Sequence, residues 1–118
     1  MGDVIRFHPE PDTWEPSHET PAAAFSTEDT SERHHPYFTS ENESVLTGVW
    51  ECAPSIMEID SYPVHEMMTL LSGSVTITDH DDGRSDTFTA GDTFLVAKGS
   101  HITWEITETL RKYYFIVT

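Results

Sequence analysis

Short bursts of alternating apolar and polar residues fill the second half of the chain. They predict eight strands, over residues 45–52, 56–60, 66–71, 74–79, 87–89, 93–97, 101–107 and 111–117. Strands this short, repeating every 8–12 residues or so, are typical of antiparallel sandwiches and barrels. No window of a dozen residues keeps its apolar positions at helical spacing, so no substantial helix is expected.

Turn residues separate these bursts. Ser72-Gly73 and the segment 80–83 supply the Gly and Asp that tight hairpins need. Two further turns are expected at 90–92 and 98–100, each with a central glycine. The pattern therefore predicts a chain of antiparallel hairpins over residues 45–118.

The first 44 residues have a different character. They hold five of the seven prolines and ten acidic residues against two basic ones, so they cannot fold alone. We expect residues 1–44 to form an extended, acidic, proline-rich arm that packs on the barrel of residues 45–118 or on a partner subunit. The apolar residues available to anchor it are Val4, Ile5, Phe7, Trp14, Phe25, Tyr37 and Phe38.

Length, composition and charge make several classes of function improbable for this chain. A chain of 118 residues has room for one domain, and its formal charge of −15 makes nucleic acids and anionic membranes poor partners. No apolar run reaches the ~20 residues of a membrane span, and the start of the chain resembles no signal peptide, so a cytoplasmic location is expected. The single Cys52 cannot form an internal disulfide.

The order of the turns carries a family resemblance. Glu66 is followed after six residues by Gly73, and Gly91 is followed after five by Ala97-Lys98-Gly99. This order resembles the two motifs of the cupin superfamily. The segments TGVWECAPS, YPVHE, LLSGSVTITDHDDG and TFTAGDTFLVAKGS are similar to one-domain ureidoglycine aminohydrolase-like cupins and to ethanolamine-utilisation cupins. The resemblance implies an all-β fold, a small antiparallel jelly-roll barrel with an extended N-terminal arm.

The chain departs from the metal-binding members of that superfamily. Their H-x-H motif, glutamate and second-motif histidine hold one divalent ion, because alternate strand residues point to one face. Here only Glu66 stands at an expected ligand position, and Ile102 takes the place of the second-motif histidine. We therefore expect no metal and no other cofactor. If a divalent metal is present, Glu66, His65 and His101 are the candidate ligands.

A carboxylate inside an apolar barrel needs a cation or a proton. Residues 45–118 contain four permanent cations, of which Lys112 and Arg111 open the last predicted strand. We expect one of the two to face inward and pair with Glu66. Both faces of that strand are largely apolar, so parity leaves the choice open.

Two aromatic residues are the other candidates for ligand binding. Trp104 shares its strand parity with Ile102 and Ile106 and should line the barrel, either to stack on a ligand or as core packing. Tyr62 stands at an H-x-H position and can offer its hydroxyl to the interior. We assign ligand binding to Tyr62, Trp104 and Lys112, and acid/base chemistry, if there is any, to Glu66.

Three functions fit these features. The first is a small-molecule-binding cupin that holds a polar metabolite near Glu66. The second is a metal-dependent aminohydrolase-like or isomerase-like enzyme, and the third is a structural or dimerisation domain. The last strand is apolar on both faces, which predicts a covering arm or a homodimer. The sequence is compatible with several ligands, and with binding alone as well as with catalysis.

Overall fold

The computed structural model describes residues 3–118 as antiparallel strands, with one short 3-10 turn and no α-helix in that part of the chain. The all-β prediction is thus confirmed. No helix there is long and apolar enough to cross a membrane. The strands are β1 (Glu15–Pro16), β2 (Glu32–Thr39), β3 (Val45–Cys52), β4 (Ser55–Ile59), β5 (His65–Asp79), β6 (Ser85–Thr89), β7 (Thr93–Val96) and β8 (Ile102–Val117).

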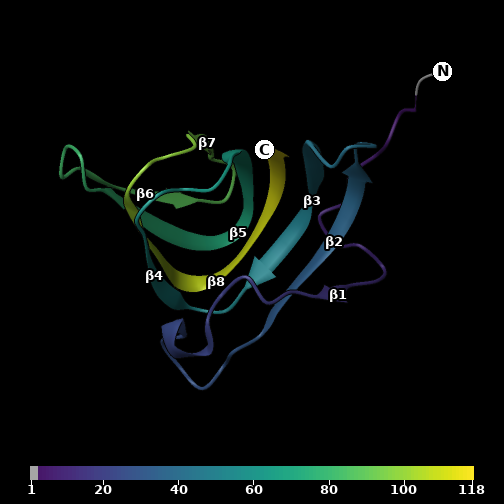
Figure 1. Cartoon of the computed structure of the whole chain (residues 1–118). Coiled ribbons are helices and arrows are strands. Elements are labelled where there is room, and N and C mark those ends of the chain that lie inside the picture. The colour runs from purple at the N-terminus through teal and green to yellow at the C-terminus, as the bar shows by residue number, and fades with distance from the viewer. Residues whose placement is uncertain (1–2) are drawn as a thin grey trace.

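Two long strands form the spine of the fold. β5 and β8 pair along nearly their whole length, from His65 opposite Val117 to Asp79 opposite Ile102. The first half of β5 also pairs with β7 and its second half with β6, while β8 pairs with β4 and then with β3. The spine curves strongly (Figure 1), so the strands enclose a core although the sheet does not close on itself.

The prediction of separate strands at 66–71 and 74–79, and at 101–107 and 111–117, is wrong. Each pair forms one bent strand, because Ser72-Gly73 makes a bulge instead of a hairpin turn. Gly73 has a φ of +83°, and a Cβ there would clash with the carbonyl oxygen of Thr109 on β8. The glycine therefore lets the two backbones pass close together where they bend.

The N-terminal arm adds strands to one edge of the sheet. β2 pairs with β3, and its register shifts between Pro36 and Phe38, as expected for a strand interrupted by proline. Phe7 stacks on Tyr37 at 4.6 Å between ring centroids. The expected burial of Val4 is wrong, since this side chain is fully exposed. Ile5 and Phe38 are also exposed, each by about 40%.

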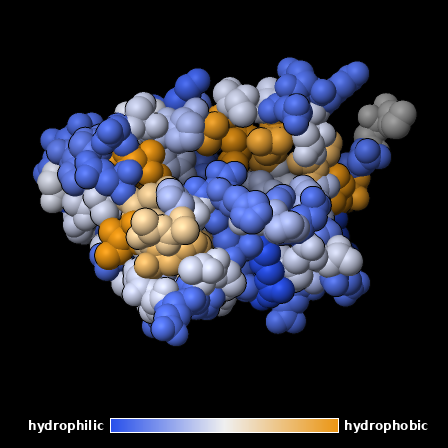
Figure 2. Space-filling model, turned by 60° about the horizontal axis from the view of Figure 1, so that its bottom comes forward, coloured by the Kyte–Doolittle hydropathy of each residue, from blue (hydrophilic) through white to orange (hydrophobic). Residues whose placement is uncertain are grey.

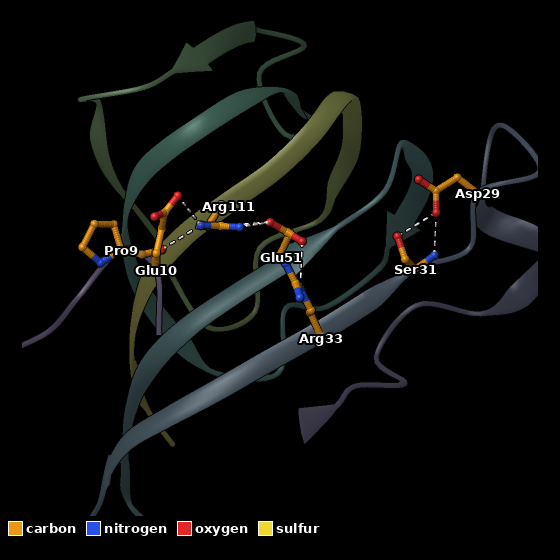
Figure 3. Close-up of polar contacts among 7 residues, drawn as sticks. All are labelled: Pro9, Glu10, Asp29, Ser31, Arg33, Glu51 and Arg111. Atoms are coloured by element: carbon orange, nitrogen blue, oxygen red, sulfur yellow. Dashed lines mark hydrogen bonds and ion pairs between the residues drawn. The ribbon is translucent and has the colours of Figure 1, made fainter. Parts of the chain in front are cut away.

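Ion pairs and a hydrogen bond hold the arm against the outer face of the sheet (Figure 3). Glu51 on β3 accepts from Arg33 on β2 at 2.9 Å and from Arg111 on β8 at 2.7 Å. Arg111 also donates to the carbonyl oxygen of Pro9 at 2.9 Å. Trp14 lies over the guanidinium of Arg33, with 4.1 Å from Cζ to the ring centroid. Arg111 therefore faces outward, towards the arm.

The core lies inside the curve of the sheet. Its buried apolar side chains alternate along the strands with outward-facing residues, as the pleat requires. They include Met68, Leu70, Val75, Ile77, Val96, Ile102, Trp104, Ile106 and Leu110. On the face seen in Figure 2, apolar patches lie between larger polar areas.

Candidate functional site

An ion pair lies inside the apolar core. Glu66 on β5 and Lys112 on β8 are each 5% exposed, and Nζ of Lys112 donates to Oε2 of Glu66 at 2.7 Å. Strand alternation explains the meeting, because residues 66, 68 and 70 point inward and Lys112 is paired with Leu70. The predicted inward cation is thus Lys112, and the alternative, Arg111, lies on the outer face.

Aromatic rings surround the Lys112 ammonium. Nζ lies 4.7 Å from the ring centroid of Trp50 and 4.9 Å from that of Trp104. The sulfur of Met68 is 3.5 Å from the same nitrogen. Ring faces attract cations most strongly where water is absent, so the two indoles help to offset the lost hydration of the ammonium.

Tyr62 occupies the second oxygen of Glu66. Its hydroxyl donates to Oε1 at 2.7 Å, and Tyr62 as a whole is 8% exposed. Burial and the neighbouring Glu66 charge raise the pKa of Tyr62 well above its usual range, so the hydroxyl remains a donor at neutral pH. Backbone bonds from Tyr62 to Ser100 and from Gly99 to Tyr62 hold the loop before β5 in place. Glu66, Tyr62, Lys112 and Trp104 are therefore brought together as one group.

The alternative metal set of Glu66, His65 and His101 is not brought together. Glu66 contacts Tyr62 and Lys112, while Nδ1 of His65 accepts from the backbone of Lys98 at 3.1 Å. His101 lies on the outer surface and contacts Glu58 at 2.6 Å. That hydrogen bond raises the pKa of His101 and lowers the pKa of Glu58.

A hollow of about 330 Å³ opens between β5, β6, β7 and the start of β8, and its lining includes none of Glu66, Tyr62, Lys112 and Trp104. Its apolar wall includes Val96, which is paired with Glu66, and Ile77, which is paired with Trp104. The charged side chains of Arg84, Asp86 and Asp79 also line it, and the remaining lining residues are Phe88, Phe94, Leu95, Ala97, Ser100 and Ile102. Glu66 and Trp104 are therefore each paired with a residue that lines the hollow.

Sequence reasoning missed two residues near the site. Trp50 is paired with Lys112 on β8 and points inward with it. The sequence pattern did not distinguish Trp50 from an ordinary core residue. His34 is paired with Trp50 from β2, and its Nδ1 is the one buried side-chain N or O atom without a hydrogen-bond partner in residues 3–118. No signal in the sequence indicated that the arm adds a strand here.

The chemistry of the group follows from its donors and acceptors. Glu66 provides a carboxylate, Lys112 an ammonium and Tyr62 a hydroxyl, all within an apolar, aromatic surrounding. Low polarity strengthens every electrostatic interaction made there. The group can thus hold a polar molecule, and a carboxylate in this setting can also exchange a proton with it.

The bent antiparallel sheet and the inward-facing Glu66 agree with the cupin fold that the sequence predicts. A family model described as the EutQ-like cupin domain matches residues 39–114, and the chain belongs to that family. The predicted membership of the cupin superfamily and the similarity to ethanolamine-utilisation cupins are confirmed.

Solved structures agree with this assignment. A DUF861-family protein of unknown function from Pseudomonas syringae pv. tomato is 27% identical over 94% of this chain, with a TM-score of 0.78. This chain spans 46% of that protein. The EutQ protein of Clostridium difficile is 20% identical, with 75% of this chain and 68% of that chain covered and a TM-score of 0.60. No curated protein matches the chain.

Proposed function

We propose that this cupin domain binds a small polar molecule in its barrel, with Glu66 as the central acidic group. Tyr62, Lys112 and Trp104 contact the ligand, and no histidine-rich metal site takes part. The observation that carries the proposal is the buried Glu66–Lys112 pair, at 2.7 Å and 5% exposure of each residue. A cytoplasmic location and the absence of nucleic-acid and membrane partners remain predictions from the sequence.

Energetics support a role beyond stability. Replacing a buried ion pair by apolar side chains of similar volume is often neutral or stabilising, so folding alone does not require such a pair. Lys112 and Glu66 are also among only five polar or charged buried residues of the described chain. A ligand that reaches Glu66 and Lys112 takes the place of some of the hydrogen bonds that these two residues now make within the protein.

The donor and acceptor pattern indicates the ligand class. An ionised carboxylate only accepts hydrogen bonds, so Glu66 selects a molecule with amino or ureido N–H groups. Lys112, released from part of its contact with Glu66, then donates to a carbonyl or carboxylate oxygen of the same molecule. Trp104 supplies an apolar face for its carbon atoms.

A thermal-shift screen of small amino, ureido and amino-acid metabolites tests the proposal. A true ligand raises the melting temperature of the wild type and of Glu108→Gln, an exposed acid on β8 that serves as the matched control. The same ligand should give no shift with Glu66→Gln or Lys112→Met, each measured against its own ligand-free melting temperature. A ligand that shifts all four proteins equally binds elsewhere and contradicts the proposal.

Enzyme activity at this site is the first alternative. Glu66 has the position for general acid/base work on a bound amine or ureide. Following each screening hit by NMR over hours distinguishes turnover from binding. Conversion that stops in Glu66→Gln would assign catalysis to this carboxylate.

A structural role is the second alternative, and a specific surface favours it. The outer face of β7, β5 and the end of β8 exposes Leu95, Met67 and Phe115, which are paired in one row across the three strands. No acidic residue points outward from these strand segments, although the chain has 21 acids. We propose that a second copy of the chain covers this face, because two chains of charge −15 can approach closely only through uncharged surfaces.

A further inference from the structure

Three potential metal ligands meet on the outer surface, away from Glu66. Glu58 lies on β4, His80 directly follows β5, and His101 directly precedes β8. One ligand atom from each residue can be chosen so that the three atoms lie within 4.8 Å of one another. Among the described residues, this is the one group of three or more His, Cys, Asp or Glu side chains with that property.

The strand register places these side chains together. The backbone nitrogen of His80 donates to the carbonyl oxygen of His101 at 3.0 Å, which extends the β5–β8 pairing by one residue pair beyond Asp79 and Ile102. Glu58 is paired with Thr103, two residues after His101. Since alternate residues of a strand share a face, all three side chains lie opposite to the buried Ile102.

The side chains of the three residues are packed closely together. The two imidazole rings stack with 4.3 Å between centroids and an interplanar angle of 24°. Nε2 of His80 is 2.7 Å from the hydroxyl of Thr103, which leaves Nδ1 of His80 for a metal. Nε2 of His101 is 2.6 Å from Oε2 of Glu58 and 3.5 Å from Oδ1 of Asp60.

Glu58 and His101 need only a small movement to share a metal ion. Metal bonds of about 2.0–2.1 Å at tetrahedral angles place ligand atoms about 3.4 Å apart. The contact between Glu58 and His101 must therefore open by less than about 1 Å. The Glu58 side chain is 56% exposed and free to make that change. Neighbouring Asp60 and Asp81 add negative charge around His101, which favours a cation.

We infer that Glu58, His80 and His101 form a zinc site on the outside of the barrel. Two imidazoles and one carboxylate are a ligand set that suits Zn²⁺, and a water molecule or Asp60 completes four-coordination. This site differs from the interior position of Glu66 and does not depend on the ligand proposed there.

Isothermal titration calorimetry of the tag-free protein with zinc chloride tests the inference. We expect about one Zn²⁺ per chain. His80→Ala and His101→Gln should each weaken binding at least tenfold, and Glu58→Gln severalfold, since each removes one of three ligands. The matched control is His18→Ala, an exposed histidine of the arm, which should bind like the wild type. Cobalt(II) as a second probe should give a tetrahedral absorption spectrum with the wild type and His18→Ala, but not with the variants of Glu58, His80 or His101.

The variants are surface substitutions, so circular dichroism should show unchanged folding. Wild-type zinc affinity in His80→Ala, or no binding by the wild type at millimolar zinc, would overturn the inference. Loss of zinc in Glu66→Gln with retention in His80→Ala would instead move the metal into the barrel. Equal losses in His18→Ala and His80→Ala would indicate nonspecific binding to histidines and would also contradict the site.

Discussion

Both oxygens of Glu66 are occupied, one by the Lys112 ammonium and one by the Tyr62 hydroxyl. Removing one partner of such a buried pair leaves a charge without compensation, which costs far more than the pair itself contributes. The same reasoning makes the residues a unit, because the effect of each substitution depends on what remains of the other two.

Lys112→Met should therefore reduce the free energy of unfolding by about 3–5 kcal/mol, measured by urea denaturation. The double variant Glu66→Gln/Lys112→Met should recover part of this loss, since it leaves no buried charge and Tyr62 can still donate to the amide oxygen. Arg84→Met, which breaks an exposed ion pair with Asp86, is the control and should change stability by less than about 0.5 kcal/mol. A Lys112→Met protein as stable as Arg84→Met would contradict this account.

At this scale the sequence predicted more of the interior than of the surface. The shortage of cations and the position of Glu66 were enough to expect that either Lys112 or Arg111 would pair with Glu66. The choice between Lys112 and Arg111 was not predictable, because Tyr113, Phe115 and Val117 make the outer face of β8 as apolar as the inner one. His80 was also missed, since the segment 79–83 was interpreted only as a hairpin turn, and the proximity of His101 depends on the β5–β8 register.

At the scale of elements, Gly73 decides how β5 and β8 bend together. Its backbone lies against Thr109 in a conformation that side chains avoid. From the sequence, Ser72-Gly73 was indistinguishable from a hairpin turn, since both need a glycine at positive φ. The bulge is favoured by the long-range pairing of β5 with β8, and the local sequence pattern gives no sign of that pairing.

Gly73→Ala should lower the free energy of unfolding by at least about 3 kcal/mol. The left-handed conformation costs about 1–2 kcal/mol and the clash with the Thr109 carbonyl a similar amount again. Gly83→Ala is a matched control, because Gly83 has a φ of +72° but nothing lies within 4 Å of an added Cβ. It should cost only about 1–2 kcal/mol. Equal losses in thermal or urea unfolding would show that the close contact of the two strands does not matter.

Glu32 links the arm to the sheet. Its carboxylate, on β2, accepts from Ser17 at 2.7 Å, from the backbone of Thr20 at 3.0 Å and from the indole of Trp50 at 2.9 Å. Burial alone would raise the pKa of Glu32, but these hydrogen bonds together lower it below its usual value. A lowered folded-state pKa means that the stabilisation is present above the unfolded pKa, 4.5, and is lost as the pH falls through the folded value.

Wild-type stability should therefore decrease from about pH 4.5 downward, and Glu32→Gln should lack this part of the decrease. At pH 7 we expect Glu32→Gln to be less stable by about 1 kcal/mol, because solvent screening limits hydrogen bonds of a half-exposed group. Urea unfolding between pH 3 and pH 7 measures both effects. Glu28→Gln, an exposed acid of the same arm, should follow the wild-type curve. An unchanged pH profile in Glu32→Gln would assign the decrease to other carboxylates.

At the scale of the whole molecule, charge and apolar surface are separated. The chain has a formal charge of −15, but no acidic side chain lies on the outer face of β7, β5 and the end of β8. There a hollow of about 190 Å³ lies between Phe7 of the arm and the side chains of Met67 and Phe115. The sequence indicated such a surface through the two-sided apolar pattern of the last strand. It did not show that the arm covers only part of that strand, around Tyr113.

Self-association through this face is the consequence we expect. Wild-type protein at tens of micromolar should elute as a dimer in size-exclusion chromatography with light scattering. Phe115→Asp should be monomeric with an unchanged circular dichroism spectrum, because a charge placed in the centre of an apolar contact has no partner there. Val4→Asp adds the same charge to a fully exposed apolar position elsewhere and should remain dimeric. A monomeric wild type, or a Phe115→Asp protein that stays dimeric, would show that a second copy does not cover this face. A dimer whose zinc and metabolite binding match those of monomeric Phe115→Asp would show that each barrel works independently.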